Sequence, residues 1–341
     1  MDSSPDQLAS PPNADDSGNR ASGGRRLIGL FGLGLMVVIA LVTLQRFMLP
    51  EIDESQTAPV VISHPNKATL EESSDPNVAA VGLPKDCLTA HINQAIIDQS
   101  DHPLDPVLDV ARDVLESIDW NIRDYTATMA SQVLVDGELQ PEKYLFVKIR
   151  HEQEPENGTK IPFAAYTKFL KPQNAAGQEA LWVEGQNDDK LIAHAAGLLN
   201  LKRVYLDPNG AMAMKGNRYP IQDIGFRNLI AKIVDHADED RHHPECQVTL
   251  TRDVDINGRN CTMLEVTHAE QSPDVDFHLA RFYLDDERNI PIAYEAYLWP
   301  AVEGEAPPLL EKYFYSDIQL NAGLTDADFD PSNEEYNYPA W

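Results

Sequence analysis

Apolar and polar residues alternate along much of the chain after residue 120, which predicts a protein rich in β-strands. After Asp124, the side chains of Tyr125, Ala127 and Met129 fall on alternate positions, with threonines between them. Successive side chains of a strand point to opposite faces of a sheet, so this period of two predicts a half-buried strand. Its apolar face must be covered by a helix, by another sheet or by something that the protein carries.

Two segments follow the helical period instead. Asp105 and Pro106 suit the start of a helix, and apolar residues then recur at three- and four-residue spacing as far as Ile118. This helix leads directly into the strand that contains Tyr125. A second amphipathic helix is expected to begin at Asp223. Its apolar side carries Phe226, Leu229, Ile230, Ile233 and Val234.

The remaining periodic segments predict strands in meander order. They comprise residues 143–151, 162–172, 179–185 and 202–207, and, after the second helix, a hairpin followed by "FHLARFYLD", "IPIAYEAYLW" and "LLEKYFYSDIQL". The order of helix, strands, helix and strands predicts an α+β fold, in which a large curved antiparallel sheet carries a few helices on its concave face.

The hairpin after the second helix surrounds an Asn-Gly pair at 257–258, which favours a two-residue turn. That turn would place Val248 opposite Thr267 and mix the two faces of the hairpin. A three-residue loop over 256–258, with its glycine in the left-handed conformation, places Val248 opposite Val266. Because the buried face decides the register, we expect the three-residue loop with a bulge.

An uncharged apolar run over residues 27–45 precedes the periodic part of the chain. Its 19 residues are enough to cross a bilayer core of ~30 Å at ~1.5 Å per residue. Arg25 and Arg26 stand before it, so the positive-inside rule places the N-terminus in the cytoplasm. A cleaved signal peptide is the alternative. The long apolar run and the missing A-x-A-like cleavage site favour an uncleaved signal anchor over residues 27–49.

The domain organisation follows from this span. Residues 1–26 are rich in Ser, Pro, Asp, Asn and Gly and are expected to form a disordered cytoplasmic tail. Residues 50–84 are again rich in Pro, Ser, Glu and Asp, which predicts a flexible stalk. Residues 85–341 would then form the extracytoplasmic domain of a single-pass inner-membrane protein.

The composition excludes some classes of partner. The chain has 55 acidic and 27 basic residues, a formal net charge of −28. Such a surface repels phosphate backbones, so nucleic acid is not an expected partner. The three cysteines, Cys87, Cys246 and Cys261, allow at most one disulfide, and their spacing does not indicate which pair would form it. The sequence likewise leaves the oligomeric state open.

No catalytic, cofactor or metal site is predicted. The chain lacks the G-x-S-x-G, H-E-x-x-H and P-loop signatures. Potential zinc ligands gather in a polar segment between the second helix and the next strand, where convergent geometry is not expected: His236, His242, His243 and Cys246. An EF-hand-like run at 326–337 has proline at its sixth position and asparagine at its twelfth, which excludes that calcium loop.

The remaining signal is apolar. Aromatic residues and a methionine recur in the predicted strands, and the candidate residues for lining an apolar-ligand site are Tyr125, Met129, Phe146, Phe163, Tyr166, Trp182, Phe282, Tyr294 and Tyr313. Any one of them could belong to an ordinary core beneath the helices. Together, on a wide sheet with few covering helices, they favour a cavity for acyl chains.

Several motifs resemble known families over roughly residues 104–338. The helix that leads into "YTATMASQ", and the closing segment "YFYSDIQLNAGLTDADFDP", resemble the lipoprotein carrier LolA and its relatives. The segments "VYLDPNGAMAM", "YPIQDIGFRNLI" and "LTDADFDPSNEEYNY" resemble an uncharacterised bacterial envelope family, domain of unknown function family 1571. These motifs are structural, so they indicate the fold better than the function.

The resemblance implies an unclosed antiparallel β-barrel whose helices cover an apolar pocket for a lipid or for the acyl chain of a lipoprotein. An uncleaved membrane span is incompatible with a soluble shuttle, so a tethered binding protein is the expected function. Two alternatives remain: a structural or protein-interaction module of the envelope with a filled core, and an envelope enzyme with a polar pocket.

Overall fold

The computed structural model describes residues 62–63, 102–155, 158–197, 200–240, 246–272, 275–302 and 304–340. The expected cytoplasmic tail, the membrane span and nearly all of the expected stalk lie outside these residues, so they stay predictions. No helix in the described part of the chain combines the length and the hydropathy that crossing a bilayer requires.

Among the described residues, thirteen strands form one sheet in the order β1-β9-β10-β11-β12-β13-β2-β4-β5-β6-β7-β8, with the short β3 beside β2. Every pairing is antiparallel. The strands are β1 (Ile62–Ser63), β2 (Asp124–Val135), β3 (Glu138–Leu139), β4 (Lys143–Arg150), β5 (Ala164–Lys171), β6 (Glu179–Val183), β7 (Leu191–His194), β8 (Val204–Leu206), β9 (Cys246–Ile256), β10 (Arg259–His268), β11 (Leu279–Asp285), β12 (Ile290–Tyr297) and β13 (Leu309–Leu320). The predicted large antiparallel sheet is therefore confirmed, and its edge strands β1 and β8 leave it unclosed within the described residues.

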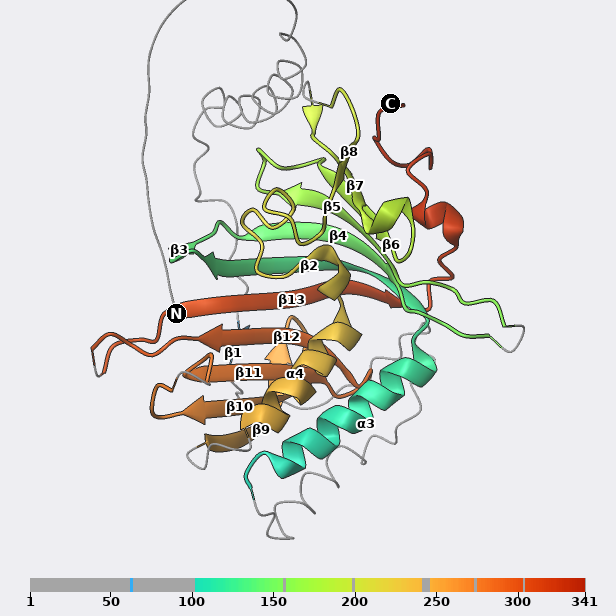
Figure 1. Ribbon diagram of the computed structural model, residues 1–341. Coiled ribbons are helices and arrows are strands. Elements are labelled where there is room, and N and C mark those ends of the chain that lie inside the picture. The colour runs from blue at the N-terminus through green and yellow to red at the C-terminus, as the bar shows by residue number, and fades with distance from the viewer. Residues whose placement is uncertain are drawn as a thin grey trace, which may run out of the picture. The chain divides into compact units, whose positions relative to one another are not determined.

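The two predicted helices are also present, as α3 (Asp105–Asn121) and α4 (Phe226–Asp240). They contact each other and lie against one face of the sheet, with α4 against β12 (Figure 1). The ring of Tyr125 on β2 stacks on that of Phe226 at 4.1 Å, so the apolar face of β2 does face a helix. The buried residues between the sheet and these helices form the main core.

Helix α4 begins three residues later than expected. Residues Ile221–Asp223 form a separate 3-10 turn, and Gly225 takes a positive φ of 115° before the helix starts. A Cβ atom on Gly225 would lie 2.7 Å from the hydroxyl oxygen of Tyr125. The chain thus approaches β2 too closely at this point for any residue other than glycine.

The prediction for the hairpin of β9 and β10 was right in register and wrong in its turn. Val248 pairs with Val266, as expected, but the loop is the two-residue Asn257-Gly258 turn with both residues at positive φ. The register survives because two residues of β9, at 252–253, oppose the single Thr262 of β10. The extra residue is absorbed in a bulge within the strands, not in the loop.

The segment after β13 covers the opposite face of β5, β6 and β7 (Figure 1). A 3-10 turn at Asp326–Phe329 places Phe329 against this face, and the ring of Tyr336 stacks on that of Tyr166 at 4.1 Å. Both faces of this half of the sheet are therefore covered, one by the helices and the segment before α4, and the other by the C-terminal segment.

Candidate functional site

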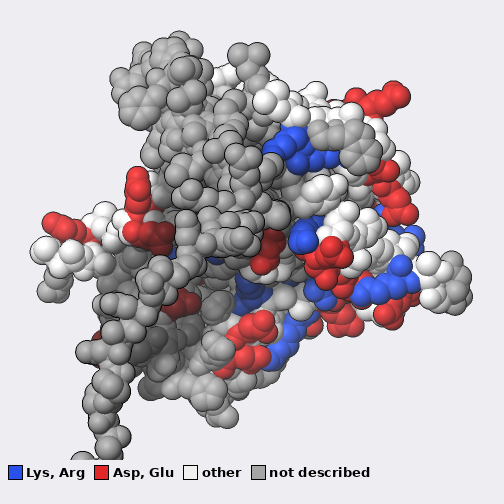
Figure 2. Space-filling model, turned by 45° about the horizontal axis from the view of Figure 1, so that its top comes forward, with Lys and Arg blue, Asp and Glu red and all other residues white. Residues whose placement is uncertain are grey.

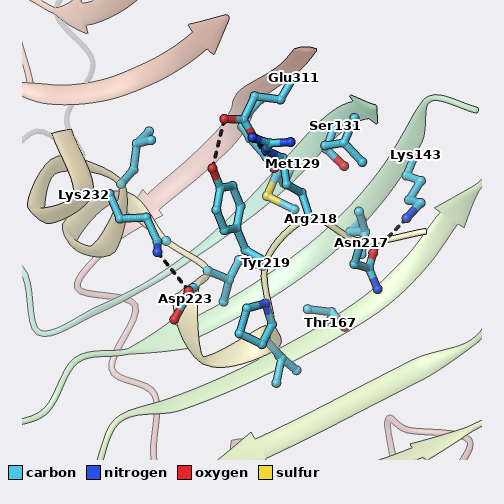
Figure 3. Close-up of a pocket in the computed structure, with 18 of the residues that line it drawn as sticks. Met129, Ser131, Lys143, Thr167, Asn217, Arg218, Tyr219, Asp223, Lys232 and Glu311 are labelled. Carbon is cyan, nitrogen blue, oxygen red and sulfur yellow. Dashed lines mark hydrogen bonds and ion pairs between the residues drawn. The ribbon is translucent and has the colours of Figure 1, made fainter. Parts of the chain in front are cut away.

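A cavity of about 410 Å³ lies between the sheet and the cover formed by α4 and the segment 206–225 that precedes it. The sheet contributes one face of β2, β4 and β5, together with residues of β11, β12 and β13. Figure 3 shows the segment that precedes α4 lying over these strands. Met212, in that segment, lines the cavity and is 48% exposed, so the cavity reaches the surface there.

Most of the lining side chains are apolar. Met129, Leu145 and Phe169 form a row across β2, β4 and β5, because Met129 pairs with Leu145 and Leu145 with Phe169. Aromatic residues continue the wall on the other side, where the rings of Phe282 and Tyr294 stack at 4.7 Å. The alternation of each strand thus places one of its apolar rows toward the cavity.

A buried carboxylate on β13 forms one polar part of the wall. Glu311 is 3% exposed, accepts hydrogen bonds from the hydroxyls of Tyr219 at 3.0 Å and Tyr313 at 3.2 Å, and lies 3.3 Å from Nε of Arg218. Burial raises the pKa of Glu311, and its pairing with Arg218 and the two tyrosines opposes that rise only in part. Burial likewise raises the pKa of Tyr219 to about 12. These contacts fasten the segment before α4 to the sheet.

Two lysines attach to the same segment. Lys232 of α4 pairs with Asp223 at 3.0 Å (Figure 3). Lys143 of β4 donates hydrogen bonds to the carbonyl oxygen of Gly216 and to Oδ1 of Asn217, the latter at 2.8 Å. Burial lowers the pKa of Lys143. These polar groups of the cavity therefore lie where the covering segment meets the strands.

The structure separates the nine residues that the sequence nominated for an apolar site. Four of them line the cavity: Met129, Phe282, Tyr294 and Tyr313. Tyr125 lies on the same face of β2, but α4 covers it. Phe163 and Trp182 pack against each other, with ring centroids 6.0 Å apart, and do not line the cavity.

The last two nominated residues, Phe146 and Tyr166, belong to the opposite face of the sheet. Their positions on β4 and β5 alternate with those of Leu145 and Ala165, which face the helices. They pack instead under the C-terminal segment. Period-two patterning identifies two faces of a strand, but it does not say which of two apolar faces carries a cavity.

The sequence did not nominate the polar residues of the cavity. Glu311 and Lys143 lie in strands, where a charged residue is usually solvated, and Arg218 and Tyr219 lie in a connection without periodicity. The one available signal is the segment "YPIQDIGFRNLI", in which Tyr219, Pro220 and Gly225 come shortly before an amphipathic helix.

The described residues contain no group of three or more His, Cys, Asp or Glu side chains that could hold a metal ion. His242 and His243 lie outside these residues. Asp326 and Asp328 of the EF-hand-like run pair with Arg150 at 2.7 Å and Lys148 at 2.8 Å. Cys246 and Cys261 are buried and are not bonded to each other, while Cys87 lies outside the described residues.

The fold and the cavity define a class of domain in which an unclosed antiparallel sheet and two helices surround an apolar pocket. A family model described as "Protein of unknown function (DUF1571)" matches residues 122–338, and the chain belongs to the DUF1571 family. The family resemblance of the sequence is therefore confirmed. A comparison with curated proteins finds no match.

Solved structures show similarity at low identity. A LolA superfamily protein from Nitrosomonas europaea is 13% identical, with 64% of this chain and 97% of that chain covered and a TM-score of 0.27. A putative outer membrane lipoprotein-sorting protein domain from Vibrio parahaemolyticus is 14% identical, with coverage of 65% and 95% and a TM-score of 0.32. The lipoprotein LppX from Mycobacterium tuberculosis is 12% identical, with coverage of 63% and 96% and a TM-score of 0.34. At these values the function has to be argued from the chain's own cavity.

Proposed function

We propose that this domain is a non-catalytic binding protein for an apolar ligand, such as a lipid or the acyl chain of a lipoprotein. The observation that carries the proposal is the cavity of about 410 Å³ between the sheet and the segment before α4. Ligand pockets in proteins usually measure roughly 300–1,000 Å³ and are lined mainly by apolar side chains. A single water needs only about 10–15 Å³, so this space is far larger than an ordinary packing gap.

The apolar row of Met129, Leu145 and Phe169 supports an acyl chain as the ligand. Water in contact with these side chains is unfavourable, and an alkyl chain would replace it at a gain of roughly 0.8 kcal/mol per buried methylene group. The size of the cavity argues against the alternative of an interaction module with a filled interior. The buried Glu311 contacts Arg218, Tyr219 and Tyr313, which supports a structural use of this carboxylate over a catalytic one.

The cellular setting belongs to the same proposal. An uncleaved anchor at residues 27–49 would hold the domain on the outer side of the cytoplasmic membrane, close to a supply of lipids. A reporter fused after Trp341 tests this orientation: a periplasmic reporter should be active in cells. Activity of a cytoplasmic reporter at the same position would contradict the proposed orientation.

Blocking the cavity tests the binding function. Ala180 of β6 lines the cavity, so Ala180→Trp should fill part of it and weaken the binding of a neutral apolar dye such as Nile red. Ala322 is exposed and does not line the cavity, so Ala322→Trp serves as the matched control. Thermal melting shows that both variants fold. Equal dye binding by the two folded variants would contradict the proposal, as would native protein that carries no lipid in mass spectrometry and binds no dye.

A further inference from the structure

Four lysine and arginine side chains line the cavity: Lys143, Lys215, Arg218 and Lys232. Arg218 pairs with Glu311 at 3.3 Å and Lys232 pairs with Asp223 at 3.0 Å. Lys215 is exposed, so water solvates its charge. Lys143 differs from the other three, because it is partly buried and, among the described residues, no carboxylate lies within 4.0 Å of its ammonium.

The known contacts of Lys143 leave part of its hydrogen-bonding capacity unused. Its ammonium donates to the carbonyl oxygen of Gly216 and to Oδ1 of Asn217. An ammonium group has three donors, and both of these acceptors are neutral. A partly buried charge without a counter-ion is costly, and burial lowers the pKa of Lys143 accordingly. If the ammonium served only to hold residues 216–217, a neutral donor such as an amide would do so without this cost.

The surroundings of Lys143 combine a polar and an apolar part. Ser131 of β2 pairs with Lys143 across the ladder and lines the cavity beside it. The next cavity-facing position on β4 is Leu145, which begins the apolar row with Met129 and Phe169. Figure 3 shows Lys143 at the edge of the cavity, with its ammonium directed toward Asn217. A ligand that satisfies both parts has an anionic head and an apolar chain.

The charge of the whole protein makes a local anchor necessary. The net charge of −28 repels anions from the surface, and acidic and basic side chains are interspersed over the described part of the face in Figure 2. An anionic head therefore needs a short-range contact with a cation that lacks a carboxylate partner. Of the three cavity cations that are not fully solvated, Lys143 alone meets this condition within the described residues.

We propose that Lys143, with the hydroxyl of Ser131 beside it, binds the anionic head of an amphiphile, and that the apolar chain of this ligand lies against Met129, Leu145 and Phe169. The head is a group with terminal anionic oxygens, a carboxylate or a phosphate. The inference rests on the proposed binding function and adds the chemical class of the ligand. Hydrogen bonds between charged partners are roughly twice as strong as neutral ones, so the head should improve affinity about tenfold.

Pairs of probes with the same chain and different heads test the inference. Hexadecanoate and hexadecyl phosphate should displace Nile red from the wild-type protein about tenfold more tightly than hexadecanol does. Lys143→Met should reduce the anionic probes to the affinity of hexadecanol and leave hexadecanol unchanged, while Lys143→Arg should retain the preference. Lys171→Met is the matched control, because Lys171 on β5 lies over the ring of Tyr144, on the face opposite to the cavity.

The outcomes separate this inference from the proposed function. Equal affinity of the wild type for hexadecanoate and hexadecanol would overturn the anionic head and leave the apolar site in place. Failure of all three probes and of the dye would overturn both. Binding of inorganic phosphate as tightly as hexadecyl phosphate would show an anion site without a role for the chain, which also contradicts the inference. A preference that Lys143→Met retains would assign the head to another residue. Thermal melting of Lys143→Met checks that the variant is folded.

Discussion

The hydroxyl of Tyr125 accepts a hydrogen bond from the backbone N–H of Phe226 at 3.1 Å. The donor is the first residue of α4, and the first N–H groups of a helix have no acceptor within the helix itself. A tyrosine on the sheet therefore takes the role that a serine or aspartate usually has at a helix start. The same contact fixes where α4 begins above β2, and so where the cavity ends.

Removing this hydroxyl should destabilise the protein. Tyr125→Phe preserves the ring stacking but leaves a buried N–H without an acceptor, so we expect a loss of about 1–3 kcal/mol in the free energy of unfolding. Urea denaturation measures the loss. Tyr205→Phe is the control, because Tyr205 is 51% exposed. If the two variants lose the same free energy, the hydroxyl of Tyr125 has no special role.

The stability of the protein should depend on the titration of Glu311. Burial raises the pKa of Glu311 above 4.5, and a carboxyl with a higher pKa in the folded state favours folding below its unfolded pKa. This contribution is lost as the pH rises through the folded pKa. Relative to Glu311→Gln, the wild type should therefore lose about 1.4 kcal/mol for each unit of the pKa shift as the pH rises above about 4.5.

The measurement for Glu311 is the free energy of unfolding against pH for both proteins. Glu138→Gln, at an exposed position of β3, makes the same change in net charge and serves as the control. A difference between the wild type and Glu311→Gln that does not change with pH would show that Glu311 keeps the same proton occupancy in the folded and unfolded states.

Lys148 should hold the C-terminal segment on the sheet. Its ammonium lies 2.8 Å from Oδ1 of Asp328 and 5.2 Å from the ring centroid of Tyr336. Lys148→Met keeps the length of the side chain and removes the charge, which should cost about 1–3 kcal/mol and raise hydrogen exchange in residues 326–338. Lys190→Met, which breaks the exposed pair with Asp188, should change neither quantity by more than about 0.5 kcal/mol. Uniform exchange throughout the sheet would contradict a local role.

The bulge in β9 should require a residue that tolerates the left-handed region. Asp253 has a φ of 56° and is exposed, so its side chain contributes little packing. Asp253→Ala should cost about 1–2 kcal/mol, and Asp253→Gly should be as stable as the wild type or slightly more stable. Thermal unfolding compares the two substitutions. Equal losses for alanine and glycine would mean that the aspartate carboxylate, and not the backbone, is required at this position.

The sequence predicts the elements of this fold better than it predicts the site. The alternation of Tyr125 and Met129 is a local property, so it locates β2 and its inner face correctly. In β4 and β5 the same alternation places apolar residues on both faces, because Tyr166 packs against the C-terminal segment and Phe169 lines the cavity. Which face borders the cavity depends on the segment 206–225 and on the C-terminal segment, and no pattern within β4 or β5 contains that information.

The polar part of the cavity could not be predicted for a related reason. Glu311 is separated from Arg218 and Tyr219 by more than 90 residues, and each of them is an ordinary surface residue type in its own segment. They come into contact only because of the order of the strands in the sheet.

The turn of the β9–β10 hairpin shows the opposite case. The local Asn-Gly signal predicted the loop correctly, and the pairing of Val248 with Val266 predicted the register correctly. The two agree once a bulge is placed at Asp253.

The order of the strands has a consequence for biosynthesis. The middle of the sheet is the pairing of β2 with β13, in which Met129 lies opposite Tyr315 after an intervening chain of more than 180 residues. The two halves of the sheet can each form hairpins early, but they join only after β13 has been synthesised. Until then both central edges are open to pairing with other extended chains, so an incomplete chain should be more prone to aggregation than the finished domain.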